Sequence, residues 1–457
     1  MKLHFIFRTF IISLVALSCV FLCAGAAGAA SAGIVRVALV RDSDDLSFKV
    51  SGNYEIVDKA TGRVLAVPKQ GEKMQVELME KRISLSGPQG NYGSFKGPLL
   101  VREASCSAAV INGSGRVTEQ SIAASMAVNS DGRAISLGSS EAPAVRSSSK
   151  TVQLTGGSDG LNLVTLNSAS AGKRYRGDME FLLEDGGLTA VNVLNIEDYL
   201  RGVVPAEILS YWHPEALKAQ AVAARNYALE RAETSRGSFD VYCDMTSQVY
   251  GGYDAESPST NKAVEETRGI VMLSGNRIVS AFYHSSSGGA TENSEDVWYD
   301  KVSYIKAKSD PYDKNGDHYN WQVSYTTDQL IKKLASAGYK FKKITDINEL
   351  ARTSSGQRVK NLEIKGEGME GKPLTVQISN ADNVRMALGL KSSLFQLTRQ
   401  YDKQKNLTGV EITGSGSGHG LGMSQYGARG MAEEGYKYQD ILKYYYSGVV
   451  IAEDYGR

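Results

Sequence analysis

The chain has 457 residues, which is enough for two domains or for one large elaborated domain. Its 51 basic and 50 acidic side chains nearly cancel, so no strong electrostatic field draws it to nucleic acid. Glycine and tyrosine are plentiful (47 and 24) and proline is sparse (9), a composition that suits a β-rich extracellular protein.

The first 32 residues have the pattern of an export signal. Lys2 and Arg8 give a positive start, an apolar run covers 9–23, and small residues with A-x-A-like cleavage sites follow at 24–32. Because the apolar run is short for a membrane span, we expect a cleaved secretory signal. An anchor that is never cleaved is the alternative, since it has a similar pattern.

The region from 33 to 151 is predicted to be a β-rich domain. Residues 34–40 alternate as a strand does, and 54–57 and 63–67 flank a turn signal, which predicts a hairpin. Loops or a linker are expected at 139–143 and 147–149. Cys106 and Cys243 are too few for a disulfide framework, and both a single bridge and two unpaired thiols remain open.

The region from 152 to 457 mixes strands and helices. Strands at 176–183 and 188–193 flank Asp-Gly-Gly, a hairpin signal. A helical pattern covers 196–203 and Pro205 is expected to interrupt it. Pro214 suits the first turn of an alanine-rich helix that runs to about residue 234. On this helix Lys218 and Arg225 lie seven residues apart and share a face.

Further along, a capping box at 326–329 begins a helix that ends at Gly338. Strands are expected at 359–364 and 374–378, and short helices at 381–388 and 438–446. The fold class is therefore predicted as α+β: a β-rich N-terminal region followed by a mixed α/β catalytic domain with a substrate-binding groove.

Three segments hold side chains that could carry chemistry. The first reads VVPAE at 203–207, and its apolar surroundings would raise the pKa of the Glu207 carboxyl, as a general acid requires. Taken alone, Glu207 also fits an ordinary surface glutamate at the start of a helix.

The second segment reads GSGHGLGMSQYGA at 416–428, where glycines permit positive φ and close approach of a ligand, and leave the ring of His419 unshielded. The third reads AFYHSSSGGATEN at 281–293. Its His284 is favoured as a hydrogen-bonding residue at a strand end, because no metal-ligand spacing accompanies it.

Together these segments resemble the SpoIID/LytB family, which comprises stage II sporulation protein D and the LytB amidase enhancer. The resemblance covers about 174–450, and its matching stretches are 196–207, 214–225, 247–251, 282–298 and 416–428. It implies a lytic transglycosylase of peptidoglycan with Glu207 as the catalytic residue. Some members carry a Cys/His zinc cluster, of which only Cys243 could match here, so we expect no metal and no cofactor.

The implied chemistry needs one carboxyl group. Glu207 would protonate the glycosidic oxygen and then deprotonate the sugar's own 6-hydroxyl, which attacks the anomeric carbon and gives a 1,6-anhydro-muramic product. The binding of sugar groups would fall to Lys218, Arg225, His284, His419 and Gln425.

The expected partners are glycan strands that lack stem peptides and, beside them, a wall amidase, at the cell wall or the outer face of the cytoplasmic membrane. A non-catalytic enhancer of an N-acetylmuramoyl-L-alanine amidase is the alternative. A purely carbohydrate-binding structural protein is a third interpretation, which the retained Glu207 disfavours.

Overall fold

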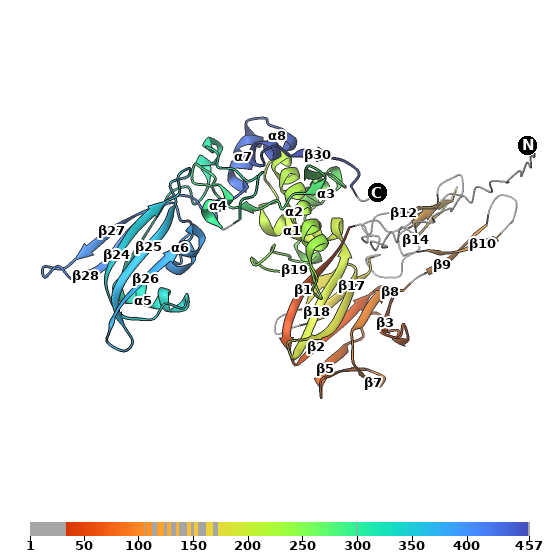
Figure 1. Cartoon of the computed structure of the whole chain (residues 1–457). Helices are drawn as coiled ribbons and strands as arrows, with labels where there is room; N and C mark the ends of the chain where they lie inside the picture. The colour runs from red at the N-terminus through yellow and green to blue at the C-terminus, as the bar shows by residue number, and fades with distance from the viewer. Residues whose placement is uncertain are drawn as a thin grey trace, which may run out of the picture.

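A computed structural model describes residues 33–104, 161–167, 172–298 and 300–455, together with the backbone of short strands between 106 and 153. Three parts are visible in Figure 1: a β part, a helical core above it, and a lobe of strands and helices that extends to one side. The targeting segment at 1–32 and the loops expected at 139–143 and 148–149 lie outside the described residues.

The β part consists of two facing sheets. One has the strand order β19-β1-β18-β17-β8-β3-β4 and the other β16-β15-β2-β5-β6-β7. Phe48 in one sheet stacks on Phe181 in the other, with ring centroids 5.2 Å apart, so the space between the sheets is a packed core. The strands are β1 (Ile34–Ser43), β2 (Asp45–Ser51), β3 (Tyr54–Asp58), β4 (Val64–Ala66), β5 (Met74–Met79), β6 (Arg82–Gly87), β7 (Gly90–Phe95), β8 (Leu99–Glu103), β15 (Leu163–Asn167), β16 (Lys173–Tyr175), β17 (Asp178–Glu184), β18 (Gly187–Asn195) and β19 (Val241–Tyr242).

Strand pairing crosses the domain boundary expected at residue 151. The first strand, β1, pairs antiparallel with β18, and β2 pairs with β15. Residues 33–103 and 161–195 therefore build the same two sheets and share one core, because each sheet needs strands from both segments. The segment between them forms three separate hairpins, from β9 (Cys106–Ile111), β10 (Val117–Ile122), β11 (Met126–Val128), β12 (Ala134–Ser136), β13 (Ala144–Ser147) and β14 (Lys150–Gln153).

Two helices form the centre of the molecule. The first, α1 (Ile196–Glu207), begins at Asn195, whose side chain accepts a hydrogen bond from the Glu197 amide. The second, α2 (Pro214–Thr234), is buried on opposite faces: Ala221 and Ala224 belong to the core of the β part, and Ala219 and Ala223 to a second core. Alanine suits this place because it has no long side chain to keep the neighbouring elements apart.

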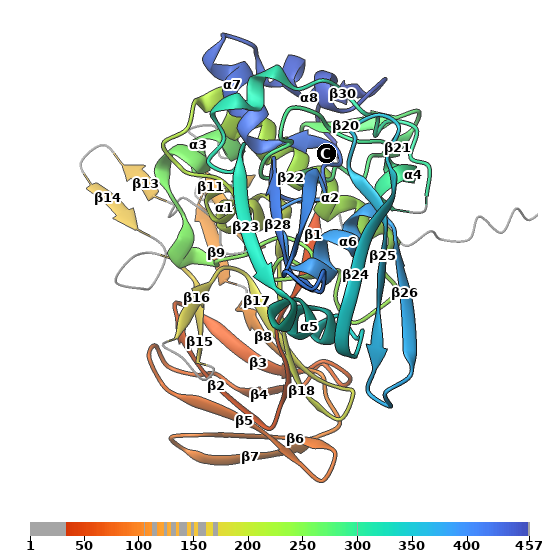
Figure 2. The same ribbon diagram turned by 90° about the vertical axis from the view of Figure 1, so that its left-hand side faces the viewer.

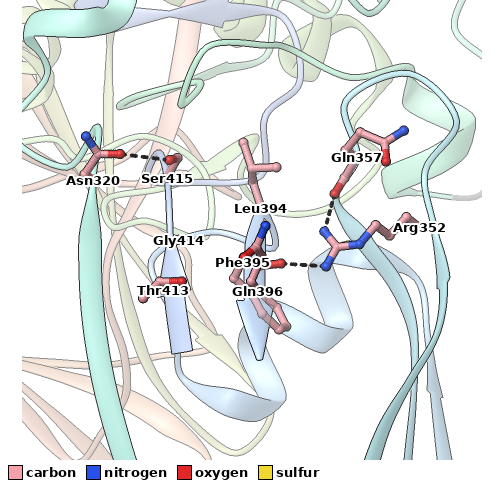
Figure 3. A pocket seen from close by; sticks show the side chains of 9 residues that line it. All are labelled: Asn320, Arg352, Gln357, Leu394, Phe395, Gln396, Thr413, Gly414 and Ser415. Carbon is pink, nitrogen blue, oxygen red and sulfur yellow. Dashed lines mark hydrogen bonds between the residues drawn. The ribbon is translucent and has the colours of Figure 1, made fainter. Parts of the chain in front are cut away.

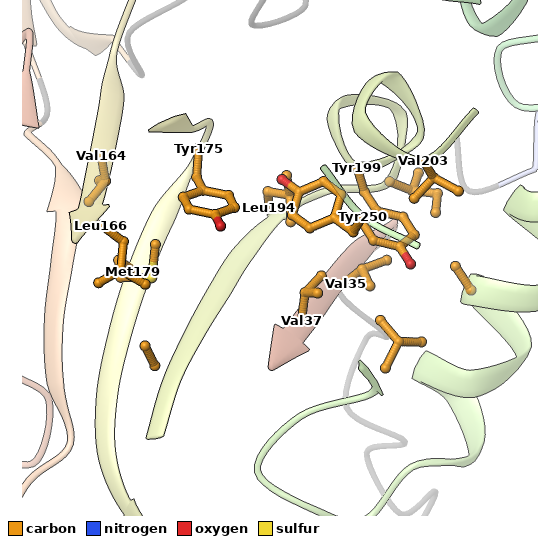
Figure 4. Close-up of a cluster of buried hydrophobic side chains, with 14 of the residues drawn as sticks. Val35, Val37, Val164, Leu166, Tyr175, Met179, Leu194, Tyr199, Val203 and Tyr250 are labelled. Carbon is orange, nitrogen blue, oxygen red and sulfur yellow. The ribbon is translucent and has the colours of Figure 1, made fainter. Parts of the chain in front are cut away.

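Aromatic rings join α1 to the β part. The ring of Tyr199 on α1 lies 5.1 Å from that of Tyr250, and Tyr250 lies 5.9 Å from Tyr175 on β16. Figure 4 shows this row of rings above the strand residues Val35 and Val37. The first turn of α1 is thus held by packing that begins in the sheets.

A buried ion pair fixes the two central helices to each other. The Arg225 guanidinium on α2 donates to both carboxylate oxygens of Glu197 on α1, at 2.9 and 2.7 Å, and also to the Ile270 carbonyl at 3.2 Å. Arg225 is 1% exposed and Glu197 is 6% exposed. Such a pair costs much desolvation, but the loss of one partner would leave an uncompensated charge in the interior.

Further elements complete the helical core. They are η1 (Tyr253–Ala255), α3 (Pro258–Glu266), β20 (Val271–Ser274), β21 (Arg277–Ile278), β22 (Tyr283–His284), α4 (Ser294–Val297), η2 (Pro311–Asn315), β29 (Met423–Ser424), α7 (Gln425–Glu433), α8 (Tyr438–Tyr445) and β30 (Val450–Ala452). Two helices from the C-terminal part of the chain, α7 and α8, pack against α2. In the part of the chain that the structure describes, no helix is both long and apolar enough to cross a membrane.

The side lobe is an insertion with a core of its own. It contains two three-stranded sheets, β23-β28-β27 and β24-β25-β26, with two helices (Figure 2). Its elements are β23 (Trp321–Thr326), α5 (Thr327–Ser336), β24 (Phe341–Arg352), β25 (Val359–Gly368), β26 (Pro373–Ser379), α6 (Ala381–Leu388), β27 (Phe395–Tyr401) and β28 (Leu407–Gly414).

Buried polar contacts attach this lobe to the core. Glu292 of the core is fully buried and accepts from the Thr353 hydroxyl at 2.6 Å and from the Gly356 amide at 3.1 Å. In the opposite direction, Arg358 of the lobe donates to the carbonyls of Ser287 and Ala290. These buried hydrogen bonds cross the junction in both directions and attach the lobe to the core.

Several local expectations are confirmed. The hairpin at Asp185 pairs β17 with β18, the hairpin of β3 and β4 forms, and Thr326 and Gln329 make a reciprocal capping box. The helices at 214–234 and 381–388 have the predicted bounds, and the last one ends a residue early at Tyr445. The overall class is α+β, as predicted.

The ion pair leads to a stability prediction. Arg225→Met leaves the Glu197 carboxylate buried without its partner, so we expect the free energy of unfolding to fall by about 3–5 kcal/mol. Denaturant unfolding followed by circular dichroism measures this change. Arg231→Met, at an exposed position of the same helix, is the matched control and should cost less than about 1 kcal/mol.

The double variant Glu197→Met/Arg225→Met removes both charges, and we expect it to be more stable than Arg225→Met alone. Two results would contradict a coupled pair. One is an Arg225→Met variant as stable as the wild type. The other is a double variant whose loss in free energy of unfolding equals the sum of two large losses in the single variants.

Candidate active site

Two distant sequence segments meet through a short parallel pairing. Strand β22 lies beside β29, with Tyr283 opposite Met423 and His284 opposite Ser424. In a separate antiparallel bridge, the Ser286 amide donates to the Ser417 carbonyl at 3.0 Å. This pairing brings the start of α7 to the end of α1, where Glu207 lies.

Glu207 is the last residue of α1, and Pro205 does not interrupt the helix as expected. The segment that follows Ser247 runs along α1: the Gly251 amide donates to the Gly202 carbonyl at 3.0 Å, and the Val249 amide donates to Glu207 Oε1 at 2.8 Å. A Cβ on Gly202 would come within 2.6 Å of the Tyr250 ring, so this approach requires glycine there. The carboxyl group is thereby held in one orientation.

Glu207 borders a pocket of about 320 Å³. The pocket lies between the end of α1, the start of α7, and the loops after β22 and η2. Its lining residues are Pro205, Ala206, Glu207, Ile208, Leu209, Trp212, Ser285, Asp317, His318, Gln425 and Tyr426. Of the five residues predicted to bind sugar groups, Gln425 lines this pocket together with Glu207, and the other four do not.

A chain of hydrogen bonds lies behind the carboxyl group. The Tyr199 hydroxyl donates to Gln248 Oε1 at 3.2 Å, which fixes the amide so that Nε2 donates to the Tyr283 hydroxyl oxygen at 2.8 Å. Since the Tyr283 oxygen accepts this bond, its own proton is available for Glu207. Gln248 and Tyr283 belong to segments that the sequence marked, although neither was predicted as a site residue.

The environment favours the neutral form of Glu207. Burial raises the pKa of its carboxyl group, and the hydrogen bonds from Val249, Gln425 and Tyr283 act in the opposite direction without cancelling it. The C-terminal end of a helix carries partial negative charge, which also disfavours a carboxylate there. The site thus presents a carboxyl group that can donate a proton and take one back, as general acid–base catalysis requires.

The opposite side of the pocket depends on a buried aspartate. Asp313 accepts from the hydroxyls of Ser286 at 2.7 Å and Ser424 at 2.9 Å, and from the Gly288 amide at 2.8 Å. This fixes the turn η2, and Asp317 and His318 follow directly after it. Neither residue belongs to a segment that the sequence marked, and no local signal predicts their position.

An aromatic pair closes one edge of the pocket. The rings of Trp212 and Tyr426 lie 5.0 Å apart, and Arg429 lies over Trp212 at 5.4 Å. Burial and a hydrogen bond with Asp317 raise the pKa of Tyr426 to about 12, so its hydroxyl is protonated at neutral pH.

The two histidines lie on the other side of β22. Successive side chains of a strand point to opposite faces, so Tyr283 faces Glu207 and His284 faces away. His284 Nδ1 lies 3.1 Å from the Leu421 carbonyl, and its ring is 5.5 Å from that of His419. His419 is covered by Trp298, with ring centroids 5.2 Å apart, rather than unshielded, and burial lowers its pKa to about 4.

The glycines around His419 serve the packing of the protein itself. A Cβ on Gly420 would lie 2.6 Å from the Arg358 guanidinium, and one on Gly422 would lie 2.0 Å from the Phe282 carbonyl. Both glycines have positive φ. The close approach that the sequence indicated therefore occurs, but toward neighbouring segments of the same chain.

The two predicted basic residues have other partners. Arg225 is buried in its ion pair with Glu197, which leaves its guanidinium no access to a sugar. Lys218 forms an ion pair with Glu266 at 2.7 Å and a longer one with Glu215 at 3.4 Å. The shared face predicted for Lys218 and Arg225 is real, because both contact residues in or just after α3.

Cys243 carries a free thiol that contacts the Leu39 carbonyl at 3.6 Å. Among the described residues no group of three or more histidine, cysteine, aspartate or glutamate side chains is arranged to hold a metal ion.

Comparison with known proteins assigns the chain to a family. Residues 184–273 match the family model described as stage II sporulation protein, SpoIID. The chain is 32% identical over 280 residues to stage II sporulation protein D of Bacillus subtilis strain 168, an alignment that covers 58% of this chain and 76% of that relative. The chain belongs to the SpoIID family.

A second SpoIID relative, stage II sporulation protein D of Bacillus amyloliquefaciens, is 31% identical over 280 residues, with coverage of 58% and 76%. The amidase enhancer of Bacillus subtilis strain 168 is 34% identical over 294 residues, which is 55% of this chain but 40% of that relative. Residues 293–422 match a separate model described as a domain of unknown function, DUF8618. That range contains the inserted lobe, whereas Glu207 and Gln248 lie in the SpoIID range.

The raised pKa of Glu207 predicts a pH-dependent stability. An ordinary glutamate has a pKa of about 4.3, so between this pH and the higher folded pKa the folded state binds more protons than the unfolded state. Wild-type stability is therefore lost as pH rises through this window. We expect Glu207→Gln, which cannot ionise, to be more stable than the wild type at pH 7, with an advantage that disappears toward pH 4.

Thermal unfolding of both proteins between pH 4 and 8 measures the difference. Glu434→Gln, at an exposed position near the end of α7, controls for the loss of one negative charge. A difference between Glu207→Gln and wild type that does not change with pH would show that Glu207 is not held in its neutral form.

Proposed function

We propose that this SpoIID-family protein is a lytic transglycosylase that cleaves peptidoglycan glycan strands, with Glu207 as its acid and base. The observation that carries the proposal is the half-buried carboxyl group of Glu207, which borders a pocket and whose pKa is raised. The names of its relatives, a sporulation protein and an amidase enhancer, support a role at the cell wall.

In the proposed reaction Glu207 donates its proton to the glycosidic oxygen as the bond to the anomeric carbon breaks. The resulting carboxylate then takes the proton of the 6-hydroxyl of the same muramic residue, whose oxygen attacks the anomeric carbon. A 1,6-anhydro ring forms, no water is consumed, and Glu207 returns to its protonated form. Tyr283 and Gln425 would stabilise the transient carboxylate, since both hydrogen-bond to it.

The pocket also contains a second carboxyl group, that of Asp317. Glycosidases that hydrolyse their substrate use two carboxyl groups, so Asp317 makes hydrolysis the competing chemistry at this site. The mass of the products separates the two reactions, because a hydrolysed strand is heavier than an anhydro product by one water.

The second candidate function is that of a non-catalytic enhancer of a wall amidase, which the name of one relative favours. In that case Glu207 would bind a glycan without cleaving it. The export pattern of residues 1–32 fits both functions, because both act outside the cytoplasmic membrane.

The proposal predicts the behaviour of Glu207→Gln on glycan strands without stem peptides. Glutamine keeps the shape of the side chain but cannot act as an acid, so we expect at least a thousandfold loss of anhydro-muramic products. Mass spectrometry of the digest measures the products, and binding of the strands by the variant should persist. Asp317→Asn is the matched control and should retain cleavage with anhydro ends.

Cleavage by Glu207→Gln at the wild-type rate would exclude Glu207 as the acid. Products that carry one additional water, lost in Asp317→Asn, would establish hydrolysis instead. A wild-type protein that cleaves no glycan but accelerates a wall amidase would establish the enhancer function.

A further inference from the structure

The inserted lobe has a pocket of its own, larger than the one beside Glu207. Its volume is about 720 Å³, against about 320 Å³ for the Glu207 pocket. It lies at the end of the sheet β23-β28-β27 and beside the turn before β25. Figure 3 shows its lining residues, which are Asn320, Arg352, Gln357, Leu394, Phe395, Gln396, Thr413, Gly414 and Ser415.

Uncharged amides and hydroxyls dominate this lining. Gln396 on β27 and Thr413 on β28 are directly opposite each other in the register and are exposed on the same sheet face. Asn320 and Gln357 are also exposed at the rim, and the Ser415 hydroxyl lies 3.3 Å from Asn320 Oδ1. Amides and hydroxyls both donate and accept hydrogen bonds, which matches the hydroxyl and acetamido groups of an N-acetylated sugar.

The charged residue of this pocket, Arg352, is engaged by the protein. Its guanidinium donates to the carbonyls of Gln357 at 2.7 Å and Phe395 at 2.9 Å, and forms an ion pair with Glu349. Gln357 has φ +61, a conformation that costs energy in residues other than glycine, and the Arg352 bond to its carbonyl helps to hold it. Arg352 thus shapes the rim and its charge is already paired.

The two pockets adjoin along one segment of chain. His318 lines the Glu207 pocket and Asn320 lines the lobe pocket, so their Cα atoms lie at most about 7 Å apart. The Gly416 amide donates to the His318 carbonyl at 2.8 Å, and Trp321 Nε1 donates to the Gly416 carbonyl at 2.9 Å. The chain segment between the two pockets is therefore fixed by hydrogen bonds to the backbone of Gly416.

We propose that the lobe pocket binds a distal part of the same glycan strand, an N-acetylhexosamine unit outside those at the cleavage site. This proposal rests on the proposed function for its substrate class. A linear polymer seated at Glu207 would extend over His318 into the lobe pocket, where uncharged amides meet its acetamido and hydroxyl groups. The lobe would then make the protein favour long strands over short oligosaccharides.

A stem peptide is the other part of peptidoglycan that could reach the lobe. It carries carboxylate groups, and the guanidinium in this pocket is occupied by Glu349 and by backbone carbonyls. A muramic unit without its stem peptide also keeps a lactyl carboxylate, whereas the N-acetylglucosamine unit of the strand is neutral and needs no unpaired cation. The charge of the lining therefore favours the N-acetylglucosamine unit of the glycan.

The test compares two glutamines on one strand. Gln396→Ala removes an amide from the pocket, and Gln400→Ala removes one from the same face of β27, about 13 Å away and outside the pocket. Both positions are exposed, so neither change removes core packing. Thr413→Trp, a second variant, fills the pocket with a bulky ring.

All variants are made in the Glu207→Gln background, which prevents turnover. Calorimetry then measures their affinity for long glycan strands without stem peptides and for a glycan tetrasaccharide without stem peptides. We expect Gln396→Ala to weaken long-strand binding about tenfold, a change of about 1.4 kcal/mol, and Thr413→Trp to weaken it further. Tetrasaccharide binding should be unchanged in both, and Gln400→Ala should match the parent protein.

Equal long-strand affinity in all variants would overturn the proposal. Weakened binding only of strands that carry stem peptides, or of free stem peptides, would assign the pocket to peptide and also overturn it. If the wild type cleaves no glycan but the variants lose long-strand affinity as expected, the proposed catalysis fails and the lobe site stands.

Discussion

The architecture of the site depends on the two-residue parallel pairing of β22 with β29. This contact joins two segments that are more than a hundred residues apart in the sequence, and the whole inserted lobe lies between them. It sets which face of β22 points to Glu207, and it places Gln425 at the start of α7 beside the same carboxyl group. Asp313 reinforces the contact by binding Ser286 on one side and Ser424 on the other. Without this register the two motif segments would have no common site.

Glu207 is placed where its charge is unfavourable, and the rest of the core tolerates this. It ends a helix, lies half-buried, and accepts a backbone hydrogen bond that holds its orientation. The compensating stability comes from elsewhere: the aromatic row from Tyr175 to Tyr199, and the paired charges of Glu197 and Arg225. A carboxyl group whose environment favours its neutral form thus ends a helix that aromatic packing and a buried ion pair hold in place.

The inserted lobe extends this arrangement without interrupting it. Its buried contacts with Glu292 and through Arg358 are made to the segment that follows β22, so the lobe is attached directly to the framework of the site. The turn that carries Asp317 and His318 leads straight into the first strand of the lobe. An insertion at this position therefore adds surface beside the Glu207 pocket, where it can influence which ligands bind.

The sequence by itself determined the features that depend on neighbouring residues: the capping box at Thr326, the hairpin at Asp185, the α+β class and the motif around Glu207. Only the tertiary structure decided the rest. Pro205 stays within α1, where local propensity indicated an interruption, because the turn before it, 199–204, is buried against the core. Strand register turned His284 away from the pocket and Tyr283 toward it, and a buried partner made Arg225 structural. Asp317 and His318 reached the pocket through Asp313, a long-range contact that no local pattern encodes.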